Sequence, residues 1–146
     1  MSNFRRLSDT MLASPQISPE DVEAAKELGV SLIICNRPDD EDAGQPAAAE
    51  IERLASEAGI AFVWIPVTSA GFSQPQVQAM RDALDSAEGN VLGYCRSGTR
   101  STLLWSLAQA SKGEDPEELA QAARDAGYDV SPVRPAMDML AGQTDG

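Results

Sequence analysis

The residues best suited to chemistry lie in one short stretch, CRSGTR, at residues 95–100. Cys95 is a nucleophile once a nearby positive charge favours its thiolate, and the planar guanidinium of Arg100 can bind an anion through two hydrogen bonds. Arg96 supplies a second cation, and Gly98 permits a tight turn. These two arginines belong to a set of only 11 basic residues in a chain of net charge −12. The stretch predicts an anion-binding loop with a cysteine at its base.

The flanking segments predict how this loop is held. The apolar run at 90–95 is typical of a buried strand, and the apolar stripe in 101–110 predicts a helix that begins near Arg100 or Ser101. A loop between a strand and a helix N-terminus turns backbone amides and the positive end of the helix dipole toward a bound anion. We therefore expect Cys95 and Arg100 to be catalytic. The expected anion-binding residues are Arg96, Ser97, Gly98, Thr99 and Ser101, with Ser101 also expected to cap the helix.

The rest of the chain predicts an α/β fold with a mainly parallel central sheet flanked by helices. Continuous apolar runs at 31–35, 61–65 and 90–95 are typical of strands buried on both faces, and a weaker strand is predicted near residue 11. Helical patterns with capping residues and terminal glycines occupy 18–29, 45–59, 73–89 and 115–127. Alternating strands and helices form right-handed crossovers, and ligands bind beyond the carboxyl ends of such strands, where Cys95 lies.

The length and the ends of the chain indicate one compact unit. The 146 residues suit a single domain over 1–146, whose last five residues, 142–146, are expected to fray. No apolar run approaches the ~18 residues that a membrane helix needs. The first ten residues carry two arginines with no apolar segment behind them, so we expect no signal peptide and a cytoplasmic protein.

Composition excludes several kinds of site. The chain has no histidine, which removes Ser-His-Asp and Cys-His catalysis and most catalytic zinc sites. Its two cysteines lie 60 positions apart and form no CxxC motif. We expect neither a metal nor a cofactor. The net charge of −12 argues against binding to nucleic acid or to an anionic membrane, and the oligomeric state stays open.

The second cysteine, Cys35, ends the apolar run at 31–35 and is expected to pack in the core. Cys95 also ends an apolar run, so both cysteines fall near the carboxyl ends of strands in one sheet. If those two strands are neighbours, Cys35 is a candidate resolving thiol for an oxidised or persulfidated Cys95.

The CRSGTR loop resembles the active loop of rhodanese-type sulfurtransferases, in which four residues separate the cysteine from the final arginine. Protein tyrosine and dual-specificity phosphatases instead carry His-Cys, five intervening residues and arginine. Here Tyr94 precedes Cys95, and Ser101 stands where a phosphatase has its arginine. A loop one residue shorter offers fewer amides, which suits a sulfur-bearing anion better than a phosphoryl group.

Most of the chain nevertheless resembles the phosphatase-like domain of bacterial beta-lactamase-hydrolase-like proteins. The resemblance lies in ASPQISPEDVEAAKELGV, ICNRPDDEDAGQP, AFVWIPV and YCRSGTRS. It implies a three-layer sandwich similar to dual-specificity phosphatases and to rhodaneses, combined with the short loop. Family membership leaves the reaction open.

Three functions follow from these residues. The first is sulfur transfer, in which Cys95 takes sulfane sulfur from thiosulfate or a persulfide and passes it to an acceptor thiol or protein. The alternative is phosphatase activity on a phosphoester through a Cys95 phosphocysteine. The second alternative is an adaptor that binds an anion without chemistry. Each takes a small anionic substrate or ligand.

The supply of a proton decides between the first two functions. Phosphoester hydrolysis needs an acid for the leaving alkoxide, whereas sulfite or a thiolate leaves as a stable anion. The segment 65–75 contains no Asp or Glu. The candidate acids come instead from the acidic loop 37–46 and are Asp39, Asp40, Asp42 and their neighbour Glu41. The missing acid and the short loop favour sulfur transfer.

Overall fold

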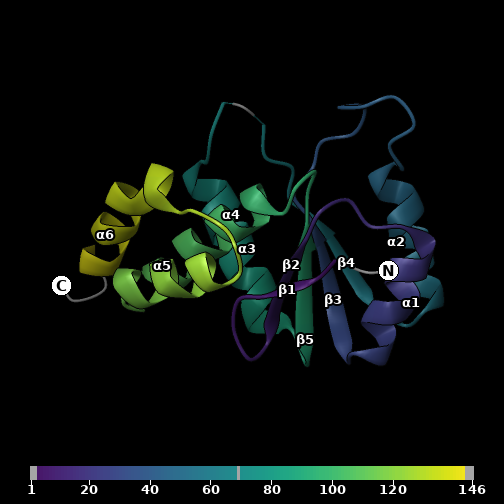
Figure 1. Ribbon diagram of the computed structural model, residues 1–146, viewed down its shortest axis with the longest axis horizontal. Helices are drawn as coiled ribbons and strands as arrows, with labels where there is room; N and C mark the ends of the chain where they lie inside the picture. The colour runs from purple at the N-terminus through teal and green to yellow at the C-terminus, as the bar shows by residue number, and fades with distance from the viewer. Residues whose placement is uncertain (1–2, 69, 144–146) are drawn as a thin grey trace.

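The structure is a computed structural model that describes residues 3–68 and 70–143, and its centre is a sheet with helices on both faces (Figure 1). The strands are β1 (Arg5–Arg6), β2 (Met11–Ser14), β3 (Val30–Cys35), β4 (Ala61–Trp64) and β5 (Asn90–Tyr94), in the order β1-β2-β5-β3-β4. Strands β2, β5, β3 and β4 are parallel, and β1 pairs antiparallel with β2. The predicted α/β architecture with a mainly parallel sheet is confirmed.

Helices form the outer layers of this sandwich. They are α1 (Pro19–Glu27), α2 (Ala48–Glu57), α3 (Gln74–Ser86), α4 (Thr99–Ser111), α5 (Pro116–Asp125), the 3-10 helix η1 (Ser131–Val133) and α6 (Arg134–Gln143). One core packs α1 and α2 against the sheet, and the other core lies between the sheet and α3 to α6. Helix α4 packs against β2, β5, α3, α5 and α6, which explains why nine of its residues are buried.

Several local signals are confirmed and others are corrected. Ser18 and Ser73 cap α1 and α3, each with a capping box. Asp115 caps α5 by accepting from the Glu117 N–H. Helix α6 ends at Gln143, and residues 144–146 of the tail that is predicted to fray lie outside the described part. The two-residue strand β1 was not predicted.

Parallel strands bring several loops to one edge of the sheet. The loops after β2, β3, β4 and β5 all leave from the carboxyl ends of neighbouring strands, which meet at that edge. Asn36 ties three of the strands together there. Its N–H donates to the Tyr94 carbonyl at 2.8 Å, and its side-chain amide donates to the Ile65 carbonyl at 2.9 Å. This edge therefore places the Cys95 loop beside the acidic loop. No described helix is long and apolar enough to cross a membrane.

Candidate active site

The Cys95 loop holds the sulfur against backbone amides. Cys95 is fully buried directly after β5, and its N–H donates to the Ser14 carbonyl at 3.3 Å. Its Sγ accepts a hydrogen bond from the Gly98 N–H at 3.1 Å. Gly98 has φ 97° and is the N-cap of α4, which begins at Thr99. The Gly98 amide and the positive end of α4 stabilise negative charge on the sulfur, as a nucleophilic thiolate requires.

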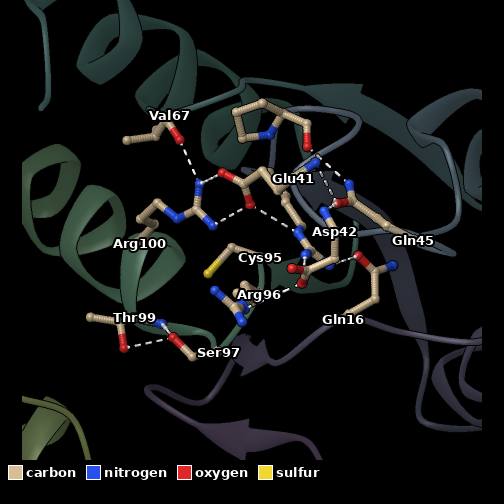
Figure 2. Close-up of polar contacts among 12 residues, drawn as sticks. Gln16, Glu41, Asp42, Gln45, Val67, Cys95, Arg96, Ser97, Thr99 and Arg100 are labelled. Atoms are coloured by element: carbon tan, nitrogen blue, oxygen red, sulfur yellow. Dashed lines mark hydrogen bonds and ion pairs between the residues drawn. The ribbon is translucent and has the colours of Figure 1, made fainter. Parts of the chain in front are cut away.

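Arg100 is clamped so that one edge of its guanidinium faces Cys95. Nη1 donates to Glu41 Oε2 at 2.8 Å and to the Val67 carbonyl at 2.7 Å, and Nη2 donates to Glu41 Oε1 at 2.8 Å. These bonds use three of the five N–H groups. The remaining edge, which carries Nε, faces the Cys95 sulfur (Figure 2). Hydrogen bonds to Glu41, followed by the charge of Cys95, raise the pKa of Arg100. The arginine therefore presents a charged, fixed donor edge where an anion would meet the sulfur.

Glu41 is an ionised clamp rather than a proton donor. Besides Arg100 it binds Arg37, whose Nε lies 2.9 Å from Glu41 Oε1. The hydrogen bonds from Arg100, and after them the one from Arg37, lower the pKa of Glu41 below its ordinary value. A carboxyl held in this way stays charged at neutral pH, so Glu41 orients Arg100 instead of supplying a proton.

The buried side chain of Arg37 binds carboxylates of the acidic loop and holds the loop in place. Its side chain is 3% exposed, and besides Glu41 it donates to Asp42 Oδ2 at 2.6 Å and to Gln16 Oε1 at 2.9 Å. Asp42 also pairs with Arg96 at 3.3 Å. Each arginine of the Cys95 loop thus meets one carboxylate of the acidic loop (Figure 2). Arg37 binds both of these carboxylates.

Two of the three sequence-predicted acids, Asp39 and Asp42, are engaged in other contacts. Asp39 Oδ1 accepts from the Ala48 N–H at 2.8 Å and so satisfies the first turn of α2. Asp42 is shared between Arg37 and Arg96. Asp40 is exposed, with φ 65°. Within residues 3–68 and 70–143, no three acidic or cysteine side chains are grouped to hold a metal ion.

The other predicted loop residues have modest local roles. Arg96 is 69% exposed, and Ser97 Oγ donates to Thr99 Oγ1 at 3.0 Å and accepts from the Thr99 N–H at 3.4 Å. The prediction that Ser101 caps α4 is wrong, because Gly98 starts the helix earlier and Ser101 lies in its first turn. The Ser101 hydroxyl is buried and has no hydrogen-bond partner among the described residues.

Tyr128, which the sequence did not indicate, supports the Cys95 loop from the segment after α5. Its hydroxyl donates to the Ser97 carbonyl at 3.3 Å. Arg5 lies 5.8 Å above its ring and donates to the Ala126 carbonyl at 2.9 Å. A Cβ built on Gly98 would lie 2.2 Å from the Tyr128 hydroxyl. Tyr128 therefore packs so closely against the loop that only a glycine fits at position 98.

Gly98→Ala is expected to destabilise the protein by about 1 kcal/mol more than Gly59→Ala. Both glycines have positive φ, so alanine costs about 1 to 2 kcal/mol of backbone strain at either position. A Cβ at Gly59 meets nothing within 4 Å, whereas one at Gly98 must displace Tyr128 and break its bond to Ser97. Urea unfolding of the two variants measures the difference. Equal losses would show that Tyr128 does not hold the loop.

Cys35 and Cys95 lie on neighbouring strands but on different sides of the sheet. Cys35 pairs in register with Tyr94, and both pack in the core under α1 and α2. Cys95 is the next residue after Tyr94, so its sulfur turns the other way, toward Gly98. Cys35 is 2% exposed, and burial raises the pKa of its thiol. Its packing in the core is as expected, and direct exchange with Cys95 would require local opening.

The sequence of the chain matches one described family. The family model of the phosphatase-like domain of beta-lactamase hydrolase-like proteins matches residues 3–112. A beta-lactamase hydrolase-like protein of Xylella fastidiosa (strain 9a5c) is 28% identical over 139 residues, which cover 94% of this chain and 32% of that protein. The chain thus spans about a third of the length of this curated relative.

Two solved structures of similar fold are phosphatases by name. A candidate phosphatase from Neisseria meningitidis has a TM-score of 0.83 and 35% identity, with 96% of this chain and 99% of that chain covered. A kinase-associated phosphatase has a TM-score of 0.71 at 16% identity, covering 99% and 94%, and shares the fold. The expected dual-specificity-phosphatase-like fold is confirmed. The chain belongs to the family of phosphatase-like domains of beta-lactamase hydrolase-like proteins.

Proposed function

We propose that the protein is a cysteine-dependent hydrolase of small phosphoesters, the function that was the alternative on sequence grounds. One observation carries the proposal: the free edge of Arg100 faces the Cys95 sulfur, while Glu41 and the Val67 carbonyl fix its other edge. The family and the phosphatase fold of its solved relatives support phosphoryl chemistry at this loop. They give no corresponding support to sulfur transfer.

The reaction has two displacements at phosphorus. The Cys95 thiolate attacks, the bond from phosphorus to the leaving oxygen breaks, and the leaving group departs with the electron pair. The free edge of Arg100 and the loop amides hold the phosphoryl oxygens. Water then attacks the phosphocysteine, the S–P bond breaks, and inorganic phosphate leaves as solvent takes the proton. The thiolate is regenerated.

The carboxylates around the site predict a strong dependence on the leaving group. Glu41 and Asp42 are ion-paired, and Asp39 is bonded to Ala48, so none is free to protonate a departing alkoxide. We expect kcat/KM for p-nitrophenyl phosphate to exceed kcat/KM for phenyl phosphate by about a hundredfold, the contribution that a general acid would otherwise supply. The comparison uses kcat/KM because both esters form the same phosphocysteine, whose hydrolysis does not depend on the leaving group. Steady-state rates for the two esters measure this ratio.

The control is Asp40→Asn, which alters an exposed acid of the same loop and is expected to leave the ratio unchanged. Similar kcat/KM values for both esters in the parent protein would show that a general acid acts. A ratio that rises only in the Asp40 variant would identify that acid.

Sulfur transfer through a Cys95 persulfide is the second candidate, and the engagement of Asp39, Glu41 and Asp42 in other contacts favours it. The intact mass is measured after brief incubation with thiosulfate or glutathione persulfide, beside Cys95→Ser. Gain of one sulfur atom only in the parent protein, discharged by cyanide as thiocyanate, would establish sulfur transfer. Hydrolysis of p-nitrophenyl phosphate without that gain would establish the phosphatase. Neither activity, with tight sulfate binding, would leave the anion-binding adaptor.

A further inference from the structure

A cavity of about 340 Å³ opens beside Arg100 and has two chemically different ends. Its charged end is the ion pair of Glu41 and Arg100, and its wall is apolar. The apolar lining comes from Val67 and Phe72, in the segment after β4, and from Leu103, one turn into α4. Arg100 lines this cavity and also faces the Cys95 sulfur, so the cavity adjoins the proposed anion site and continues along an apolar surface.

A second cavity, of about 410 Å³, continues this surface along α4. Phe72 lines both cavities, and Leu107 lies one turn after Leu103 on the same helix. The far wall comes from α6, where Met139 is 66% exposed. The two cavities thus share Phe72 as a wall, and their apolar linings reach from the ion pair to α6.

We propose, building on the proposed function, that the substrate is an amphiphilic phosphoester. Its phosphoryl head sits between Cys95 and Arg100, and the apolar body of its leaving group occupies the first cavity. An apolar leaving group that is longer than the first cavity extends past Phe72 into the second cavity. The charge of the protein favours a substrate with a single anionic head. Its net charge of −12 repels polyanions, and the Glu41–Arg100 pair is neutral as a unit.

Alkylphosphonates test the subsite, because they present the anionic head and an apolar chain but cannot be hydrolysed. Isothermal titration compares methyl-, butyl- and octylphosphonate on the parent protein. A buried methylene strengthens binding by about fourfold, so butylphosphonate should bind at least about tenfold more tightly than methylphosphonate. Phe72→Ser should reduce this ratio several-fold. Met139→Ser is the matched control: it should preserve the butyl-to-methyl ratio and weaken only the further gain of octylphosphonate.

Each outcome separates the subsite from the reaction. Equal affinities for the three phosphonates, or a ratio that Phe72→Ser leaves intact, would overturn the subsite. Tighter binding of a phosphotyrosyl peptide than of octylphosphonate would overturn the amphiphile in favour of a protein substrate. A chain-length gain with no turnover of any phosphoester would support the subsite and overturn the proposed phosphatase. Failure of inorganic phosphate and all three phosphonates to bind would overturn both.

Discussion

Cys95→Ser is expected to lower kcat for p-nitrophenyl phosphate by at least about a thousandfold. A serine hydroxyl stays protonated at neutral pH and needs a base to become a nucleophile. The chain contains no histidine, and the nearby carboxylates Glu41 and Asp42 are already bound by arginines. The Gly98 amide and Arg100 can stabilise a thiolate but cannot remove a proton from serine. The variant should keep its affinity for inorganic phosphate while losing turnover.

Cys35→Ser is the matched control for this experiment, because it makes the same change at the other cysteine. Cys35 packs under α1 and α2, on the side of the sheet away from the Cys95 sulfur, so its loss should alter stability rather than chemistry. Rates are compared per folded protein, as measured by thermal unfolding. If Cys95→Ser retained a tenth of the parent kcat, or if Cys35→Ser lost as much as Cys95→Ser, the assigned nucleophile would be wrong.

The elements around the site were predictable because each has a strong local signal. Continuous apolar runs mark β3 and β5, as expected for strands covered on both faces. Ser18 and Ser73 sit before proline-containing first turns and cap their helices as expected. The placement of Cys95 between a strand and a helix N-terminus follows from the apolar run of β5 and the apolar stripe of α4. The short strand β1 carries no such signal, since its two residues are exposed arginines.

The residues that contact the Cys95 loop were not predictable, because these contacts join segments that are distant in the sequence. Glu41 lies 59 positions before Arg100. In the sequence it is one acid among several in a loop whose composition is typical of a solvent-exposed segment. Only the parallel sheet brings the end of β3 beside the end of β5. Tyr128 meets Ser97 across 31 positions, and nothing in its local sequence marks it. Ser101 was misassigned as a cap because the positive φ of Gly98 lets α4 begin one residue before Arg100.

Arg100→Lys is expected to lower kcat/KM for p-nitrophenyl phosphate by about a hundredfold to a thousandfold. Lysine keeps the charge but carries all its donors on one nitrogen. Arg100 bonds Glu41 and the Val67 carbonyl while its other edge faces Cys95, and an ammonium cannot meet both sides at once. Arg96→Lys is the matched control: Arg96 is 69% exposed with a single ion pair at 3.3 Å, so its loss should cost less than about threefold.

The Glu41→Gln variant tests whether the Glu41 carboxylate acts only by positioning Arg100. A neutral amide offers one acceptor oxygen where the carboxylate offers two, so the Arg100 guanidinium should be held less firmly in its orientation. We expect kcat/KM to fall, though by less than in Arg100→Lys. If Glu41 does nothing but position Arg100, the Glu41→Gln/Arg100→Lys double variant should be no slower than Arg100→Lys alone. Additive losses would mean that Glu41 contacts the substrate or its water itself. A rate above that of the parent in Glu41→Gln would mean that the carboxylate competes with substrate for the arginine, and the positioning role would fall.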